Sequence, residues 1–142
     1  MHKLIKIVLI IFFVLSCSNQ MRPINYGQDI CTHCKMHIID QQHGAELVSQ
    51  YGKVFMYDSI ECMMNSLSTQ NFNDYSMFLV NTYGNPSELS DAQQCVYIIY
   101  DGIPSPMGDY LTAFRSNDAL DLFDHQDIDA ILTWEELKKQ YE

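Results

Sequence analysis

The sequence predicts an α+β fold made of two small, related ββαβ-like subdomains. Two observations lead to this prediction. Short apolar segments typical of strands are interrupted by segments with helical spacing, and the order strand, strand, helix, strand occurs twice. Gly44 and Gly108 each follow a polar turn and open a strand in the two copies. We therefore assign one subdomain to residues 31–90 and the other to residues 91–142, with chance likeness of short amphipathic segments as the alternative to a repeat.

The first subdomain begins with a predicted β-hairpin. Residues 46–50 and 53–58 are rich in strand-forming side chains, and Tyr51-Gly52 between them is typical of a tight turn. Asp58-Ser59 then provides capping side chains for a helix from Ile60 to about Leu67.

The second subdomain follows the same order. Residues 94–100 are nearly continuously apolar, which indicates a buried strand, and residues 110–115 form the next strand. A capped helix should follow, with its apolar face formed by Ala119, Leu120, Leu122 and Phe123. Residues 130–133 are the last predicted strand, and they lead into a short helix over residues 134–141.

The first 16 residues have the features of a bacterial lipoprotein signal peptide. Lys3 and Lys6 precede an apolar run that is too short to span a membrane, and Cys17 follows as the expected site of lipid attachment. An ordinary secretory signal is the alternative, and either one places the mature chain outside the cytoplasm. Residues 17–30 are polar and rich in turn-forming residues, so we expect a tether between the lipid and the folded part.

Composition and motifs exclude several classes of function. The formal net charge of −10 argues against nucleic-acid binding, because such proteins neutralise phosphates with lysine and arginine. The chain has no nucleophile elbow and no glycine-rich phosphate loop. We therefore predict an accessory protein and not an enzyme.

The segment Cys31-Thr32-His33-Cys34-Lys35-Met36 carries the strongest functional signal. It places two thiols and a thioether within six residues, and soft ligands of this kind favour copper(I). His43 and Met107 each precede the glycine that opens a strand, so the internal repeat predicts that both join Cys31, Cys34 and Met36 as ligands. Cys62 is interpreted first as a core residue of a helix and only second as a ligand, and Cys95 as a buried, inert thiol.

Other uses of the cysteines remain open. Four thiols are left after Cys17 is assigned to the lipid, and they allow three disulfide pairings. A disulfide-stapled surface lipoprotein without metal is one alternative, and a thiol-disulfide oxidoreductase that uses Cys31 and Cys34 is another. A zinc site would need a second ligand pair at fixed spacing, which the sequence lacks.

Several motifs, taken in their order, resemble the NosL lipoproteins of the nitrous oxide reductase gene cluster. These motifs are the lipoprotein cysteine, Cys-x-x-Cys-x-Met from Cys31, Gly-Ala-Glu-Leu-Val from Gly44, Gly-Lys-Val-Phe-x-Tyr-Asp-x-Ile-x-Cys-Met from Gly52, and Pro-Met-Gly from Pro106. Members of that family usually have glycine where this chain has Lys35, so we expect the backbone at that turn to differ.

The resemblance implies a membrane-anchored copper(I) chaperone that delivers copper to nitrous oxide reductase. It also implies a periplasmic β-helix partner that belongs to an ABC transporter, and a fold similar to part of organomercurial lyase. Cys31, Cys34, Met36 and Met107 match the family's positions for soft-metal binding, whereas His43 follows only from the internal symmetry. The expected location is the cell envelope, lipid-anchored on the extracytoplasmic side.

Overall fold

The computed structural model describes residues 20–116, 121, 123 and 127–141. The predicted signal peptide and the lipid-attachment residue Cys17 lie outside the described residues. Most of the helix predicted after Ser116 also lies outside them, although its Phe123 is described and packs with a ring-centroid distance of 5.8 Å against Phe114.

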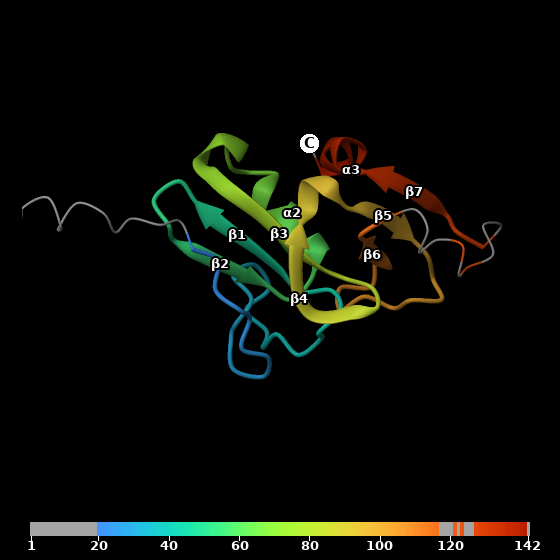
Figure 1. Cartoon of the computed structure of the whole chain (residues 1–142), viewed down its shortest axis with the longest axis horizontal. Helices are drawn as coiled ribbons and strands as arrows, with labels where there is room; N and C mark the ends of the chain where they lie inside the picture. The colour runs from blue at the N-terminus through green and yellow to red at the C-terminus, as the bar shows by residue number, and fades with distance from the viewer. Residues whose placement is uncertain (1–19, 117–120, 122, 124–126, 142) are drawn as a thin grey trace, which may run out of the picture.

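The larger sheet is antiparallel and has four strands in the order β2-β1-β3-β4. The strands are β1 (Ala45–Ser49), β2 (Val54–Tyr57), β3 (Tyr75–Thr82) and β4 (Asn85–Asp91). β1 and β3 lie in the middle of this sheet and are largely buried, while β4 is a polar edge strand (Figure 1).

The β1–β2 hairpin confirms the sequence prediction. Leu47 pairs with Phe55 across the two strands, and the Gly52 N–H donates to the Ser49 carbonyl at 2.9 Å. Gly52 has a φ of 80°, a left-handed conformation that glycine adopts without the steric cost of a Cβ atom.

The helix that follows β2 is also the predicted one, α2 (Ile60–Leu67). Its N-cap is Ser59, whose hydroxyl oxygen accepts a hydrogen bond from the Cys62 N–H at 3.2 Å. α2 is followed by a single-turn 3-10 helix, η2 (Phe72–Asp74), which leads into β3.

The smaller sheet has three antiparallel strands in the order β6-β5-β7. A second 3-10 turn, η3 (Ala92–Gln94), precedes β5 (Val96–Ile99), and β6 (Leu111–Phe114) comes next. β7 (Ala130–Thr133) and α3 (Trp134–Tyr141) then complete the described chain, both with the bounds predicted from the sequence.

Both halves contribute to one hydrophobic core. Trp134 of α3 packs against Phe78 of β3 with a centroid distance of 5.5 Å and against Tyr97 of β5 at 6.2 Å. The Tyr83 N–H donates to the Ala113 carbonyl at 2.8 Å and links the two sheets through their backbones. The two antiparallel sheets and their helices confirm the α+β class (Figure 1).

The topology corrects the way in which the two halves were matched. The strand after Gly44 is β1, which lies between two neighbours, whereas the strand after Gly108 is β6, which lies at an edge. In each sheet the strand that comes first in the chain, β1 or β5, lies between the second and the third. β5 is therefore the topological counterpart of β1. The equivalence of His43 and Met107, which was based on those two glycines, is therefore not supported by the strand order.

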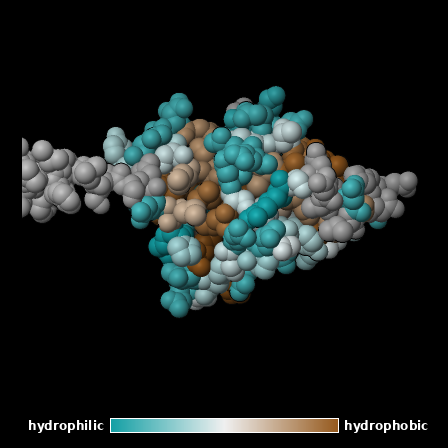
Figure 2. Space-filling view, viewed as in Figure 1, coloured by the Kyte–Doolittle hydropathy of each residue, from teal (hydrophilic) through white to brown (hydrophobic). Residues whose placement is uncertain are grey.

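The surface in this view is mixed. Figure 2 shows hydrophobic residues (brown) interspersed with hydrophilic ones (teal) on this face. Within the described part of the chain, no helix has both the length and the apolar character that crossing a bilayer requires. Large hydrophobic side chains that are exposed include Ile30, Met36, Ile39 and Met107, all of which lie in loops.

Candidate metal centre

Three cysteine side chains meet between the N-terminal loop and α2. The Sγ atoms of Cys31, Cys34 and Cys62 all lie within 4.8 Å of one another. Cys31 and Cys62 are fully buried, whereas Cys34 is partly exposed, and all three are free thiols. The structure thus brings together two cysteines predicted as ligands and a third that the sequence favoured as a core residue.

A tight turn places the first two sulfur atoms. The Cys31 N–H donates to the Met36 carbonyl at 2.8 Å, and the Lys35 N–H donates to the Cys31 carbonyl at 3.1 Å. Lys35 has a φ of 66°, so the lysine adopts the left-handed conformation that glycine favours, and the different backbone expected at this turn is not found. This turn folds the Cys-x-x-Cys segment back on itself, and an isolated bridge between Ile30 and His37 closes it.

The same turn is attached to the strand that leads into α2. The Thr32 N–H donates to the carbonyl of Met56 in β2 at 2.7 Å. β2 ends at Tyr57, and the Ser59 cap then fixes the first turn of α2, which contains Cys62. A backbone contact and a helix cap therefore determine where the third sulfur atom lies relative to the first two.

The electrostatics of the cluster divide the three thiols into different states. A hydrogen bond from the Cys62 thiol is the main reason that the pKa of Cys31 is lowered to about 4, and it outweighs the opposing effect of burial. The Cys34 N–H, 3.5 Å from the Cys31 sulfur, contributes in the same direction. The same interaction raises the pKa of Cys62 far above its usual range, and burial raises the pKa of Cys34.

The cluster therefore offers one thiolate and two thiols to an incoming ion. Thiolate sulfur is the protein ligand that selects soft metals such as copper(I), and binding would displace the remaining protons. Three sulfur donors can satisfy copper(I), whereas a structural zinc site requires four ligands. The cluster consists of these three cysteines, and no other described His, Cys, Asp or Glu side chain belongs to it.

The two predicted methionines lie in exposed loops. Met36 is 48% exposed and belongs to the same turn as Cys34. Met107 is 39% exposed and lies in the loop between β5 and β6. Their assignment as ligands stays a prediction.

Both ring nitrogen atoms of His43 already have hydrogen-bond partners. Its ring is buried, with Nδ1 3.0 Å from Asp40 Oδ1 and Nε2 3.1 Å from Thr112 Oγ1. To bind a metal, the imidazole would have to give up one of these contacts. The position of His43 is explained by its link between the first loop and β6.

Cys62 was given too little weight from the sequence because its neighbours are apolar. Met63 and Met64 beside it are fully buried, as expected for a core helix, and the same spacing hides a ligand at the first turn. The sequence contained one indication of this role, the Ser59 cap. The cap places residue 62 in the first turn of the helix, next to the segment that packs against that end.

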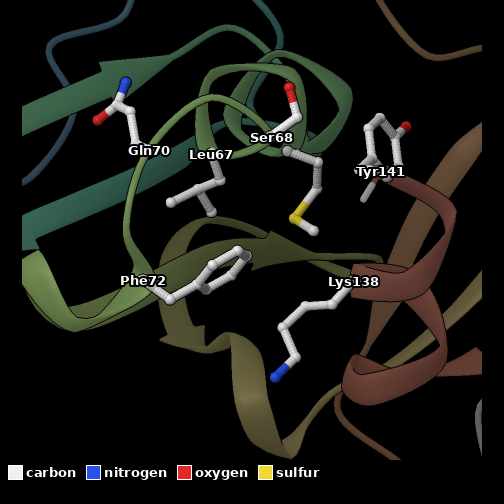
Figure 3. A pocket seen from close by; sticks show the side chains of 7 residues that line it. Leu67, Ser68, Gln70, Phe72, Lys138 and Tyr141 are labelled. Carbon is white, nitrogen blue, oxygen red and sulfur yellow. The ribbon is translucent and has the colours of Figure 1, made fainter.

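A separate pocket lies between the end of α2 and α3 (Figure 3). It has a volume of about 250 Å³, and none of the three clustered cysteines lines it. Lys138 at its edge pairs with Glu135 at 2.7 Å and lies 5.5 Å from the centre of the Phe72 ring. Its one cationic side chain is thus already partnered, and we assign no chemistry to this pocket.

The fold and the cluster together define a small α+β domain with a candidate soft-metal centre formed by three cysteines. The chain belongs to the NosL family, whose model matches residues 24–142. This match confirms the family resemblance that was inferred from the motifs.

A solved structure has the same fold. It is the crystal structure of the copper chaperone NosL from Shewanella denitrificans, with a TM-score of 0.73 and 16% sequence identity. The alignment covers 87% of this chain and 99% of that chain. At this identity the likeness is a likeness of fold. A comparison with curated protein sequences gives no match.

Proposed function

We propose that this protein is a copper(I) carrier in which Cys31, Cys34 and Cys62 supply sulfur ligands. The observation that carries the proposal is the convergence of the three Sγ atoms to within 4.8 Å. Membership of the NosL family and the fold of a protein named as a copper chaperone support it. The protein is then a metal-handling accessory protein, with copper as its cargo.

The three cysteines differ in burial, and this difference suggests the side from which copper is transferred. Cys31 and Cys62 are enclosed by the core, while Cys34 reaches the surface beside the exposed Met36. A partner's sulfur or imidazole ligand can approach copper from the Cys34 side and replace the protein's ligands one at a time. Exchange through shared intermediates lets a carrier hold the ion tightly and still release it.

The finer assignment follows from the family resemblance. We propose that the acceptor is nitrous oxide reductase and that a periplasmic β-helix protein of an ABC transporter takes part. Cys17 would carry a lipid that holds the protein on the extracytoplasmic side of a membrane. Such an anchor raises the effective concentration of the carrier near other membrane-bound components.

An anaerobic titration tests copper binding. Purified protein should take up one equivalent of copper(I) and develop sulfur-to-copper charge-transfer absorption. The absorption should be lost in a Cys31→Ser, Cys34→Ser double variant and weakened in Cys62→Ser. Cys95→Ser is the matched control, because Cys95 is buried elsewhere and donates its thiol to the Asp91 carbonyl. Unchanged absorption in the double variant would refute the proposal.

Delivery needs its own experiment. Copper-loaded protein is mixed with metal-free nitrous oxide reductase, and the recovery of reductase activity is followed with and without an excess of a copper(I) chelator. The proposal predicts recovery even when free copper(I) is trapped. Recovery only in the absence of the chelator would mean that the protein is not the donor.

One observation favours a second function. A thiolate at Cys31 next to other thiols is typical of thiol-disulfide oxidoreductases as well as of metal sites. Such an enzyme should catalyse the reduction of insulin by a small dithiol, and its disulfide should have a reduction potential in the exchange range. If the protein is only a copper carrier, it should reduce insulin no faster than the Cys31→Ser variant does.

A further inference from the structure

Glu61 is a buried carboxylate that neither the helix cap nor the core explains. It directly precedes Cys62 in the first turn of α2, and Ser59 already serves as the N-cap. Its Oε1 atom accepts a hydrogen bond from the Ser105 hydroxyl and a second, of 3.4 Å, from the Leu111 N–H. Its Oε2 atom is buried and has no hydrogen-bond partner among the described residues.

The two donors lie at the two ends of one loop. Ser105 begins the segment and Leu111 begins β6, so a single carboxylate oxygen fixes both ends of residues 105–111. Inside the loop, the Tyr110 N–H donates to the Ser105 hydroxyl oxygen at 2.9 Å, and the Gly108 N–H donates to the Ser105 carbonyl at 3.1 Å. Met107 lies between these contacts and is 39% exposed.

Burying a carboxylate is an energetically unfavourable way to hold a helix against a loop. Transfer of an ionisable group out of water costs several kcal/mol unless its oxygen atoms are fully hydrogen-bonded, and Oε2 is not. An apolar side chain could fill the same space without that cost. What the carboxylate adds is a fixed orientation of the Met107 loop relative to the helical turn that carries Cys62.

We propose that Glu61 is a positioning residue for the copper site. It connects the loop that presents the Met107 thioether to the turn that presents the Cys62 thiol, without touching copper itself. The inference rests on the proposed copper-carrier function and extends it, since it makes the second half of the chain a structural part of the site. Hydrogen-bonding partners of this kind orient metal ligands, and their loss weakens metal binding by about 10- to 100-fold.

A double-mutant cycle tests the inference. The dissociation constant for copper(I) is measured by competition with a coloured chelator for wild type, Glu61→Ala, Met107→Leu and the double variant. We expect Glu61→Ala to bind about 10- to 100-fold more weakly than wild type. In the Met107→Leu background the same substitution should change the affinity little, because the ligand that Glu61 positions is already gone.

Further variants separate positioning from stability. Glu61→Gln keeps the acceptor oxygen and should lose much less affinity than Glu61→Ala. Ser105→Ala breaks the contact from the loop side and should also weaken binding, which keeps the test available if Glu61→Ala does not fold. Glu46→Ala is the matched control, since Glu46 is equally buried but accepts its hydrogen bond from the Arg22 N–H at 3.2 Å.

The outcomes are distinct. An equal loss of affinity on Glu61→Ala in both backgrounds, or no loss in wild type, would overturn the inference and leave the copper carrier intact. Glu61→Gln as weak as Glu61→Ala would overturn it too, since charge and not hydrogen bonding would then be responsible. A wild-type protein that does not bind copper(I) would overturn the proposed function together with the inference.

Discussion

Removing the Cys62 thiol should raise the pKa of Cys31 in the metal-free protein. The hydrogen bond from Cys62 is the largest of the effects that lower the pKa of Cys31 to about 4. Hydrogen bonds to charged groups contribute about 1.5–3 kcal/mol, and one pKa unit corresponds to about 1.4 kcal/mol. Cys62→Ala should therefore raise the pKa of Cys31 by about one to two units.

The assay is the ultraviolet absorbance of the thiolate as a function of pH, measured on reduced, metal-free protein. Burial raises the pKa of Cys34 and that of Cys95, to about 11 for Cys95, so the step at low pH belongs to Cys31. Cys62→Ser is an informative partner variant, because its hydroxyl can still donate to the thiolate but is a poor ligand for copper(I). It should keep the low pKa and lose copper affinity.

Cys95→Ala is the control for a general effect of losing a buried thiol. A pKa of Cys31 that stays the same in Cys62→Ala would refute the contact between the two thiols. Because the folded state lowers this pKa from 9.0, the stabilisation is fully present above pH 9.0 and is lost as the pH falls toward about 4. In Cys62→Ala, this loss of stability should be smaller.

Three further predictions concern stability. Burial raises the pKa of Glu46 from 4.5 to about 7, so its contribution is present below pH 4.5 and is lost as the pH rises through about 7. The loss of stability is at most about 3 kcal/mol. When the free energy of unfolding in urea is measured between pH 4.5 and about 7, Glu46→Gln should not show the loss that wild type shows. Ser59→Ala should lower the free energy of unfolding by about 1 kcal/mol, because α2 loses its N-cap. Leu137→Ala should cost about 2–5 kcal/mol in the same assay, since this side chain is fully buried. A cost below 1 kcal/mol for Leu137→Ala would contradict the packing of α3 on the core.

Local signals predicted the parts of the fold that local chemistry determines. Tyr51-Gly52 forms the predicted hairpin turn, and Ser59 caps the predicted α2. β7 and α3 have the predicted bounds because an apolar strand there runs directly into a segment with acidic residues in the first helical turn and basic residues in the last.

The ββαβ order predicted a strand after α2 but gave it no bounds, and β3 is that strand, whereas β4 was not predicted at all. Only Met77 to Val80 form an apolar run in β3, between Ser76 and Asn81, and a run this short did not define the bounds of the strand. β4 is polar and contains Pro86, which an edge strand tolerates because one side of its backbone remains unpaired. Only pairing with β3 identifies β4 as a strand.

The candidate site divides in the same way. The Cys31 and Cys34 pair is visible in the sequence because one turn contains both residues. Cys62 joins them only through the Thr32 to Met56 backbone contact and the packing of α2, which are tertiary interactions. The role proposed for Glu61 depends in turn on where the Ser105 loop docks, and the sequence alone does not show that position.

Copper K-edge X-ray absorption on protein loaded with one equivalent of copper(I) tests the central claim most directly. We predict a first shell dominated by sulfur, with the number of sulfur neighbours reduced in Cys34→Ser and in Cys62→Ser and unchanged in Cys95→Ser. A first shell of nitrogen and oxygen, or a sulfur shell that does not change in Cys62→Ser, would contradict a copper site formed by the three converging cysteines.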